Sequence, residues 1–75
     1  MIDPRGMRVE DWCNQTSLLL SKLGAMPVMR PGDDWKNWAF AVIEDPQVEV
    51  YMPPDPRNYD SWLEWAERFV QAVPL

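Results

Sequence analysis

The pattern Trp-x-x-Trp-Ala occurs twice in this sequence, at residues 35–39 and again at residues 62–66. Each copy follows an acidic residue and an approach that contains proline. On a helix, positions i, i+3 and i+4 share one face, so each copy would place two indoles and a methyl group side by side. Because tryptophan buries a large area, the repeat indicates packing or docking through indoles. It does not indicate catalysis.

The length of the chain limits how much core it can build. Its 75 residues form one small domain at most. At this size, the apolar surface buried on folding only about balances the conformational entropy that is lost. Cys13 is the only cysteine and there is no histidine, so neither an internal disulfide nor a usual Cys/His zinc site can add stability. We therefore expect a protein partner, or self-association, to complete the fold.

The charge of the chain excludes several classes of partner. The formal net charge is −5 at pH 7, and negative charge opposes contact with nucleic-acid phosphates and with anionic lipid. The longest strongly apolar run, residues 18–20, is too short for a membrane span or a signal sequence. The sequence therefore predicts a protein made in the cytoplasm, with neither nucleic acid nor a membrane as its partner.

The polar residues do not favour an enzyme. Without histidine, acid–base chemistry would fall to carboxylates, and the adjacent pairs at 33–34 and 44–45 would point about 100° apart on a helix. Capping and solubility explain such pairs. Cys13 has no histidine partner, and we expect it to be a small buried side chain beside Trp12. We predict no catalytic residue, no cofactor and no bound metal.

Two segments have the spacing of amphipathic helices. After an irregular arm over residues 1–6, residues 7–24 follow a helical period and end at Gly24, which is placed as the C′ residue. The first apolar stripe consists of Val9, Trp12, Cys13, Thr16, Leu20 and Leu23. The second, in residues 58–73, consists of Trp62, Trp65, Ala66, Phe69, Val70 and Val73. These stripes predict one helix near each end of the chain, each with one face in the core.

The middle of the chain, residues 33–45, is compatible with two structures. As a helix it would have Asp33 as its N-cap, with the indoles of the repeat on one face. As a strand it would turn back into residues 48–52, whose apolar side chains alternate. That alternative is an α+β fold with a β-hairpin at about 38–52 between two helices. The tryptophan repeat favours the helix.

Two connectors complete the outline. Residues 25–32 include Met26 and Met29, and they either fold back over the core or form a flexible contact strip for a partner. Residues 46–57 are rich in proline and are predicted to be an extended, stiff linker. The sequence therefore predicts a mainly α domain with three helices, at about 8–23, 34–44 and 60–73.

Tryptophan and methionine side chains are the candidates for contact with a partner. At least three of the five tryptophans are expected to form the core. Four tryptophans on two short helices exceed what a chain of this size easily buries, so the alternative is that one pair anchors an interface. The candidate contact residues are Trp35, Trp38, Trp62, Trp65, Met26, Met29 and Met52.

Residues 56–73 resemble a segment of small structural proteins of tailed bacteriophages, in which a proline-rich stretch leads into Trp-x-x-Trp-Ala and a short amphipathic helix. Residues 33–39 look like a second copy, so the resemblance extends over residues 31–73. It implies a virion component of the tail or head–tail region, made in the host cytoplasm and present with other virion proteins in multiple symmetric copies. It supplies no catalytic residue. The alternative is a small acidic phage-encoded inhibitor that binds a host protein.

Overall fold

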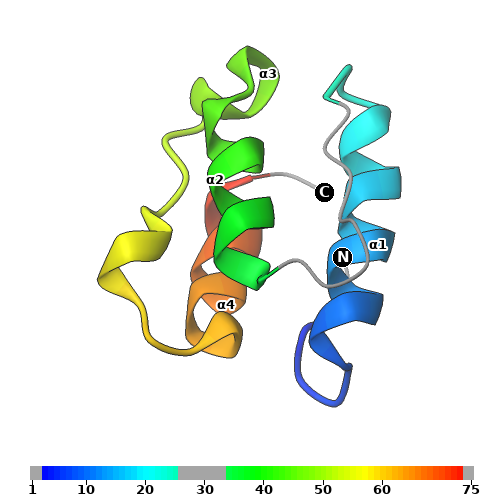
Figure 1. Cartoon of the computed structure of the whole chain (residues 1–75). Coiled ribbons are helices and arrows are strands. Elements are labelled where there is room, and N and C mark those ends of the chain that lie inside the picture. Colours follow the sequence, from blue (N-terminus) through cyan, green and yellow to red (C-terminus); the bar gives the residue numbers. More distant parts are fainter. Residues whose placement is uncertain (1–2, 26–33, 74–75) are drawn as a thin grey trace.

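Helices make up all the regular secondary structure in the residues that the computed structural model describes, 3–25 and 34–73 (Figure 1). They are α1 (Val9–Ser21), α2 (Trp35–Glu44), α3 (Pro46–Glu49), the 3₁₀ helix η1 (Pro56–Asn58) and α4 (Trp62–Ala72). The predicted mainly α fold is confirmed. The alternative hairpin over 38–52 is not supported, because most of that segment lies in α2 and α3.

The helices surround a core of tryptophan. Figure 1 shows α1 facing α2 and α4, with α3 at the end of the molecule where α1 finishes. Trp12 of α1, Trp38 of α2 and Trp65 of α4 are 1%, 2% and 1% exposed. The prediction that at least three tryptophans form the core is confirmed.

The three buried indoles contact one another edge to face. Their ring centroids are 5.7 Å apart for Trp12 and Trp38, 6.2 Å for Trp12 and Trp65, and 6.0 Å for Trp38 and Trp65. The interplanar angles are 78°, 89° and 85°. Aromatic pairs prefer this geometry, which adds about 0.5–1.5 kcal/mol per pair beyond the burial of area. One cluster of side chains therefore holds α1, α2 and α4 together.

Helix α1 buries the predicted stripe and ends where the sequence indicates. Gly24 adopts φ +93°, which few residues other than glycine tolerate. The Ala25 N–H donates to the Leu20 carbonyl and the Gly24 N–H to the Ser21 carbonyl, both at 3.1 Å. This is the Schellman arrangement, with Gly24 as C′ as predicted. A Cβ added at Gly24 would lie 3.6 Å from Cγ of Gln47, so α3 lies beside this turn.

Helix α2 begins at Trp35, one residue later than a helix capped by Asp33 would begin. The N-cap is Asp34, whose carboxylate accepts a hydrogen bond from the Lys36 N–H at 3.3 Å. The prediction of Asp33 as the N-cap is therefore wrong, and Asp33 itself lies outside the described residues. The cause is the Asp33-Asp34 pair: two adjacent aspartates carry the same capping signal.

The predicted extended linker over residues 46–57 is wrong at both ends. Residues 46–49 form α3, and residues 56–58 form η1. Pro46 and Pro56 each occupy the first helical position, where the missing N–H costs nothing and the fixed φ suits a helix. Both prolines fall in the segment predicted to be an extended linker, but each one starts a helical turn.

Helix α4 is shorter than the predicted 58–73. Its first residue is Trp62 and its N-cap is Ser61. The cause is η1, which uses Asn58 and leaves Tyr59 extended, at φ −128° and ψ 132°. The predicted apolar stripe is confirmed, with its central side chains buried and those at its edges packed against the core.

Candidate functional site

Two of the predicted contact residues lie inside the core. Trp38 and Trp65 are 2% and 1% exposed, so a partner that binds the folded chain cannot reach them. The indole N–H groups of both side chains also make hydrogen bonds within the chain. The Trp38 indole N–H donates to Oγ of Ser17 at 3.0 Å, and the Trp65 indole N–H donates to the carbonyl of Pro54 at 2.8 Å. In the folded chain these side chains hold helices and connectors together.

Trp35 and Trp62 are half-buried and lie at the edge of the same cluster. The Trp35 ring is 6.0 Å from that of Trp65, and the Trp62 ring is 6.1 Å from that of Trp12. Nζ of Lys36 lies 5.8 Å from the Trp35 ring centroid, within cation–π range. The fold thus packs more indole than the size of the chain predicts, and it leaves these two rings partly exposed to solvent.

Met52 is the predicted contact residue that the structure exposes. Its side chain is 86% exposed, and the two residues before it, Val50 and Tyr51, are 72% and 38% exposed. We call these three consecutive residues the apolar tip. Met26 and Met29 lie outside the described residues. Sequence reasoning missed Val50 and Tyr51 because the alternation over 48–52 resembles a strand.

The backbone holds the apolar tip in a defined turn. The Tyr51 N–H donates to the Val48 carbonyl and the Met52 N–H donates to the Glu49 carbonyl, both at 3.0 Å. Val48 is fully buried and fixes the turn to the core. On the other side, the carbonyl of Pro54 accepts the indole hydrogen bond described above. The apolar tip is therefore anchored to the core at both of its ends.

Met52 adopts φ +53°, the left-handed region that side chains other than glycine, asparagine and aspartate rarely occupy. This conformation costs an L-residue about 1–2 kcal/mol. Such backbone strain persists only where the surrounding structure enforces it, and it gathers at binding and active sites. The turn thus holds a long apolar side chain in solvent, at a position that would suit glycine.

The charged residues that precede the apolar tip in the chain are acidic. Glu44 ends α2, Asp45 caps α3 and Glu49 ends α3, and no lysine or arginine occurs between Lys36 and Arg57. We call these three carboxylates the acidic rim. An apolar centre with a charged rim is the usual arrangement of a protein interface.

A second apolar surface lies on the outer side of α1. Leu18 is 70% exposed, and with Gln15, Leu19 and Lys22 it lines a shallow depression of about 340 Å³. We call this depression the α1 groove. Lys22 is the only charged residue between Trp12 and Ala25. The α1 groove is thus apolar and positively charged at one end.

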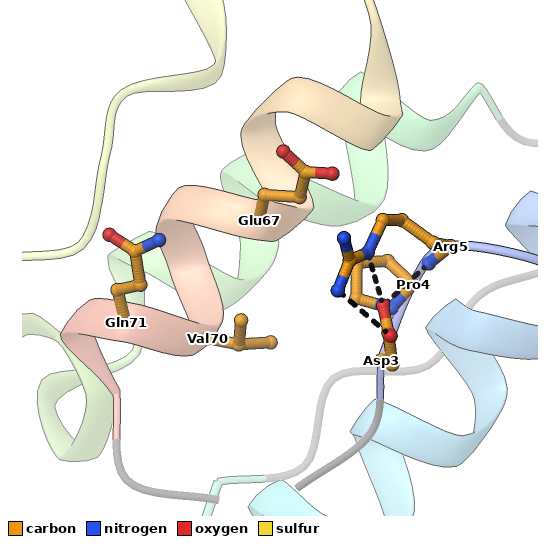
Figure 2. A pocket seen from close by; sticks show the side chains of 6 residues that line it. All are labelled: Asp3, Pro4, Arg5, Glu67, Val70 and Gln71. Carbon is orange, nitrogen blue, oxygen red and sulfur yellow. Dashed lines mark hydrogen bonds and ion pairs between the residues drawn. The ribbon is translucent and has the colours of Figure 1, made fainter.

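A second hollow, of about 430 Å³, lies between the N-terminal arm and α4 (Figure 2). Its lining residues are Asp3, Pro4, Arg5, Glu67, Val70 and Gln71. Figure 2 shows the Arg5 guanidinium turned back onto the Asp3 carboxylate, with Nε 3.1 Å from Oδ1. This contact lowers the pKa of Asp3 and raises the pKa of Arg5. The pair stabilises the turn of the arm.

The buried polar groups are few. Burial, with the nearby charge of Glu10, raises the pKa of the Cys13 thiol to about 12, so the thiolate nucleophile is disfavoured. Among the described residues, the buried Trp12 Nε1 and Thr16 Oγ1 atoms have no hydrogen-bond partner. In the same residues, no group of three or more Cys, Asp or Glu side chains could hold a metal ion.

None of the helices in residues 3–25 and 34–73 combines the length and the apolar character needed to cross a bilayer. Compared with known proteins, the chain matches no protein-family model, no curated protein and no solved structure.

Proposed function

We propose that this chain is a structural protein that docks onto a larger protein assembly through the apolar tip. The observation that carries the proposal is the exposure of Val50, Tyr51 and Met52 on a turn with a fixed backbone. Contiguous exposed apolar side chains are typical of protein interaction sites. A turn that is already formed loses little conformational entropy when a partner binds.

The assembly that we propose is a virion of a tailed bacteriophage, with the chain in the tail or head–tail region. The support is the resemblance of residues 56–73 to small structural proteins of such particles. The proline-rich stretch and the tryptophan helix that carry the resemblance pack as one unit, because Pro54 and Trp65 share a hydrogen bond of 2.8 Å. In this proposal the buried tryptophans build the fold and the apolar tip makes the contact.

Photo-crosslinking in the cells that make the protein tests the docking. Replacing Tyr51 with p-benzoylphenylalanine keeps an aromatic ring in the apolar tip and makes it reactive under light. We expect a specific crosslink to a protein of a large, sedimenting assembly. The same amino acid at Glu64, an exposed position on α4, is the control. Equal yields from the two positions would show that the apolar tip is not the docking surface.

Mass spectrometry of purified particles tests the virion. A structural protein is expected in every particle at a fixed stoichiometry with the other virion proteins. If the chain is instead made early in infection and is absent from particles, the virion proposal fails and an inhibitor of a host protein takes its place.

A further inference from the structure

We propose that a second copy of this chain binds the apolar tip, and that the tip of one copy docks in the α1 groove of the next. This inference rests on the proposed function, because it names a partner for the same apolar tip. It joins two surfaces that the core leaves exposed, on separate parts of the fold: the turn after α3, and the outer face of α1.

The proposed contact pairs exposed apolar side chains with a depression that is lined in part by apolar side chains. The apolar tip is a turn on which Met52 is 86% exposed. The α1 groove is a depression of about 340 Å³ next to Leu18, which is 70% exposed. Methionine is flexible and adapts to irregular apolar surfaces. Insertion of Met52 beside Leu18 would therefore remove two strongly exposed apolar side chains from water in a single contact.

Charge decides which surfaces pair. The acidic rim of Glu44, Asp45 and Glu49 precedes the apolar tip in the chain, and the Met52 N–H donates to the Glu49 carbonyl, whereas the α1 groove carries Lys22. Contact between two tips would place acidic side chains on both sides of the interface with no cation between them, and contact between two grooves would place a lysine on both sides with no carboxylate. Like charges placed opposite each other disfavour an interface, and opposite charges favour it. Tip-to-groove contact is the pairing that satisfies both the apolar and the charged groups.

The symmetry of the resulting assembly follows from this pairing. The apolar tip and the α1 groove are different surfaces, so the contact is heterologous. A row of copies then has one free tip at one end and one free groove at the other. If these two ends meet, a ring closes; if they do not, the row can extend as a filament. One such contact, repeated between copies, is enough to build an assembly that contains several copies of a structural protein.

The hollow beside the N-terminal arm is a poorer receptor for the apolar tip. Its one cation, Arg5, already pairs with Asp3, with Nε 3.1 Å from Oδ1. It also presents the Glu67 carboxylate, which would repel the acidic rim. The α1 groove has no carboxylate in its lining.

Analytical ultracentrifugation of complementary variants tests the contact. The tip variant, Val50→Ser with Met52→Ser, keeps an intact groove, and the groove variant, Leu18→Glu, keeps an intact tip. The parent chain is expected to associate as its concentration rises from micromolar to millimolar, whereas each variant alone stays monomeric. An equimolar mixture of the two variants should associate again and stop at a heterodimer. A parent chain that stays monomeric, or a mixture that stays monomeric, would overturn the inference.

Charge reversal gives an independent measurement. Lys22→Glu should raise the dissociation constant of the parent assembly by about tenfold or more. Arg68→Glu makes the same change of charge on the exposed side of α4 and should have a much smaller effect. Adding Glu49→Lys to Lys22→Glu should restore part of the affinity. If Lys22→Glu and Arg68→Glu weaken association equally, the charge acts through the whole molecule and the tip-to-groove contact is wrong.

Failure of this inference and failure of the proposed function give different results. A chain that is monomeric at all concentrations, but that crosslinks from position 51 to another protein of an assembly, refutes self-association and leaves docking intact. A chain that forms tip-to-groove oligomers, but that does not sediment with any larger assembly, retains the contact and refutes docking onto such an assembly.

Discussion

Three aspartates in this chain shape the backbone through the same local hydrogen bond. Asp3, Asp45 and Asp55 each precede a proline, and each accepts a hydrogen bond of 2.9 Å from the N–H two residues further on. This is an Asx turn, in which the aspartate side chain replaces a backbone acceptor. The Asp-Pro pair is visible in the sequence and could have located α3 and η1. The high proline content of residues 46–57 instead predicts an extended linker.

One residue-scale prediction concerns the Thr16 hydroxyl. It is fully buried and its oxygen has no partner among the described residues. An unsatisfied buried polar group costs about 1–3 kcal/mol. Thr16→Val replaces the hydroxyl with a methyl group of similar size, and we expect it to raise the free energy of unfolding by about 1 kcal/mol in a urea melt. A loss of stability would mean that the hydroxyl has a partner, such as a buried water.

A second residue-scale prediction concerns pH. Burial raises the pKa of the Cys13 thiol from 9.0 to about 12. The neutral thiol therefore contributes stability that is complete below pH 9.0, the unfolded value, and that is lost as pH rises towards about 12. We expect the stability advantage of the parent over Cys13→Ala to shrink over this range, in denaturant melts under reducing conditions. An advantage that stays constant would contradict the raised pKa.

At the scale of elements, apolar periodicity alone was enough to predict α1 and α4. Their stripes are long, and the residues that they assign to the core are the ones that pack there. The periodicity of α2 was ambiguous, and the tryptophan repeat resolved it correctly. Helix α3 has four residues, too few for any period to be read, and only its Asp-Pro start marks it. The exposure of the apolar tip depends on that short helix, so the sequence indicated Met52 but not its neighbours.

The tryptophan repeat gives a prediction that compares two positions on one helix. Trp65 is 1% exposed, contacts four other aromatic rings and donates a hydrogen bond to Pro54. Trp65→Ala should therefore cost about 3–5 kcal/mol, enough to unfold a domain of this size. Trp62 is half-buried, and Trp62→Ala should cost clearly less. Thermal melts followed by circular dichroism measure both; equal losses would contradict the arrangement of the core.

Helix starts give a second element-scale prediction. Asp45 caps α3 through its carboxylate, whereas the side chain of Ser61, at the start of α4, makes no capping hydrogen bond. Asp45→Ala should lower the free energy of unfolding by about 1 kcal/mol. Ser61→Ala should change it by less than about 0.5 kcal/mol. Denaturant melts of the two variants decide this, and a larger loss for Ser61→Ala would show that the caps are assigned wrongly.

At the scale of the whole molecule, the fold separates two uses of apolar side chains. Indoles from α1, α2 and α4 close the core, and the apolar tip stays outside it. The sequence predicts contact residues in the tryptophan repeat as well as Met52, and it does not separate core from contact within the repeat, because burial depends on contacts between segments that are distant in the chain. The Trp38 indole of α2 donates a hydrogen bond to Ser17 of α1, and no local sequence pattern predicts that contact.

The central claim is that the apolar tip serves docking and the buried tryptophans serve folding. Incorporation of the tip variant, Val50→Ser with Met52→Ser, into the purified assembly tests it most directly, with its free energy of unfolding measured alongside. We predict an unfolding free energy within about 0.5 kcal/mol of the parent, together with a loss of most of the incorporated protein. A tip variant that is as stable as the parent and incorporates at the parent level would contradict the claim.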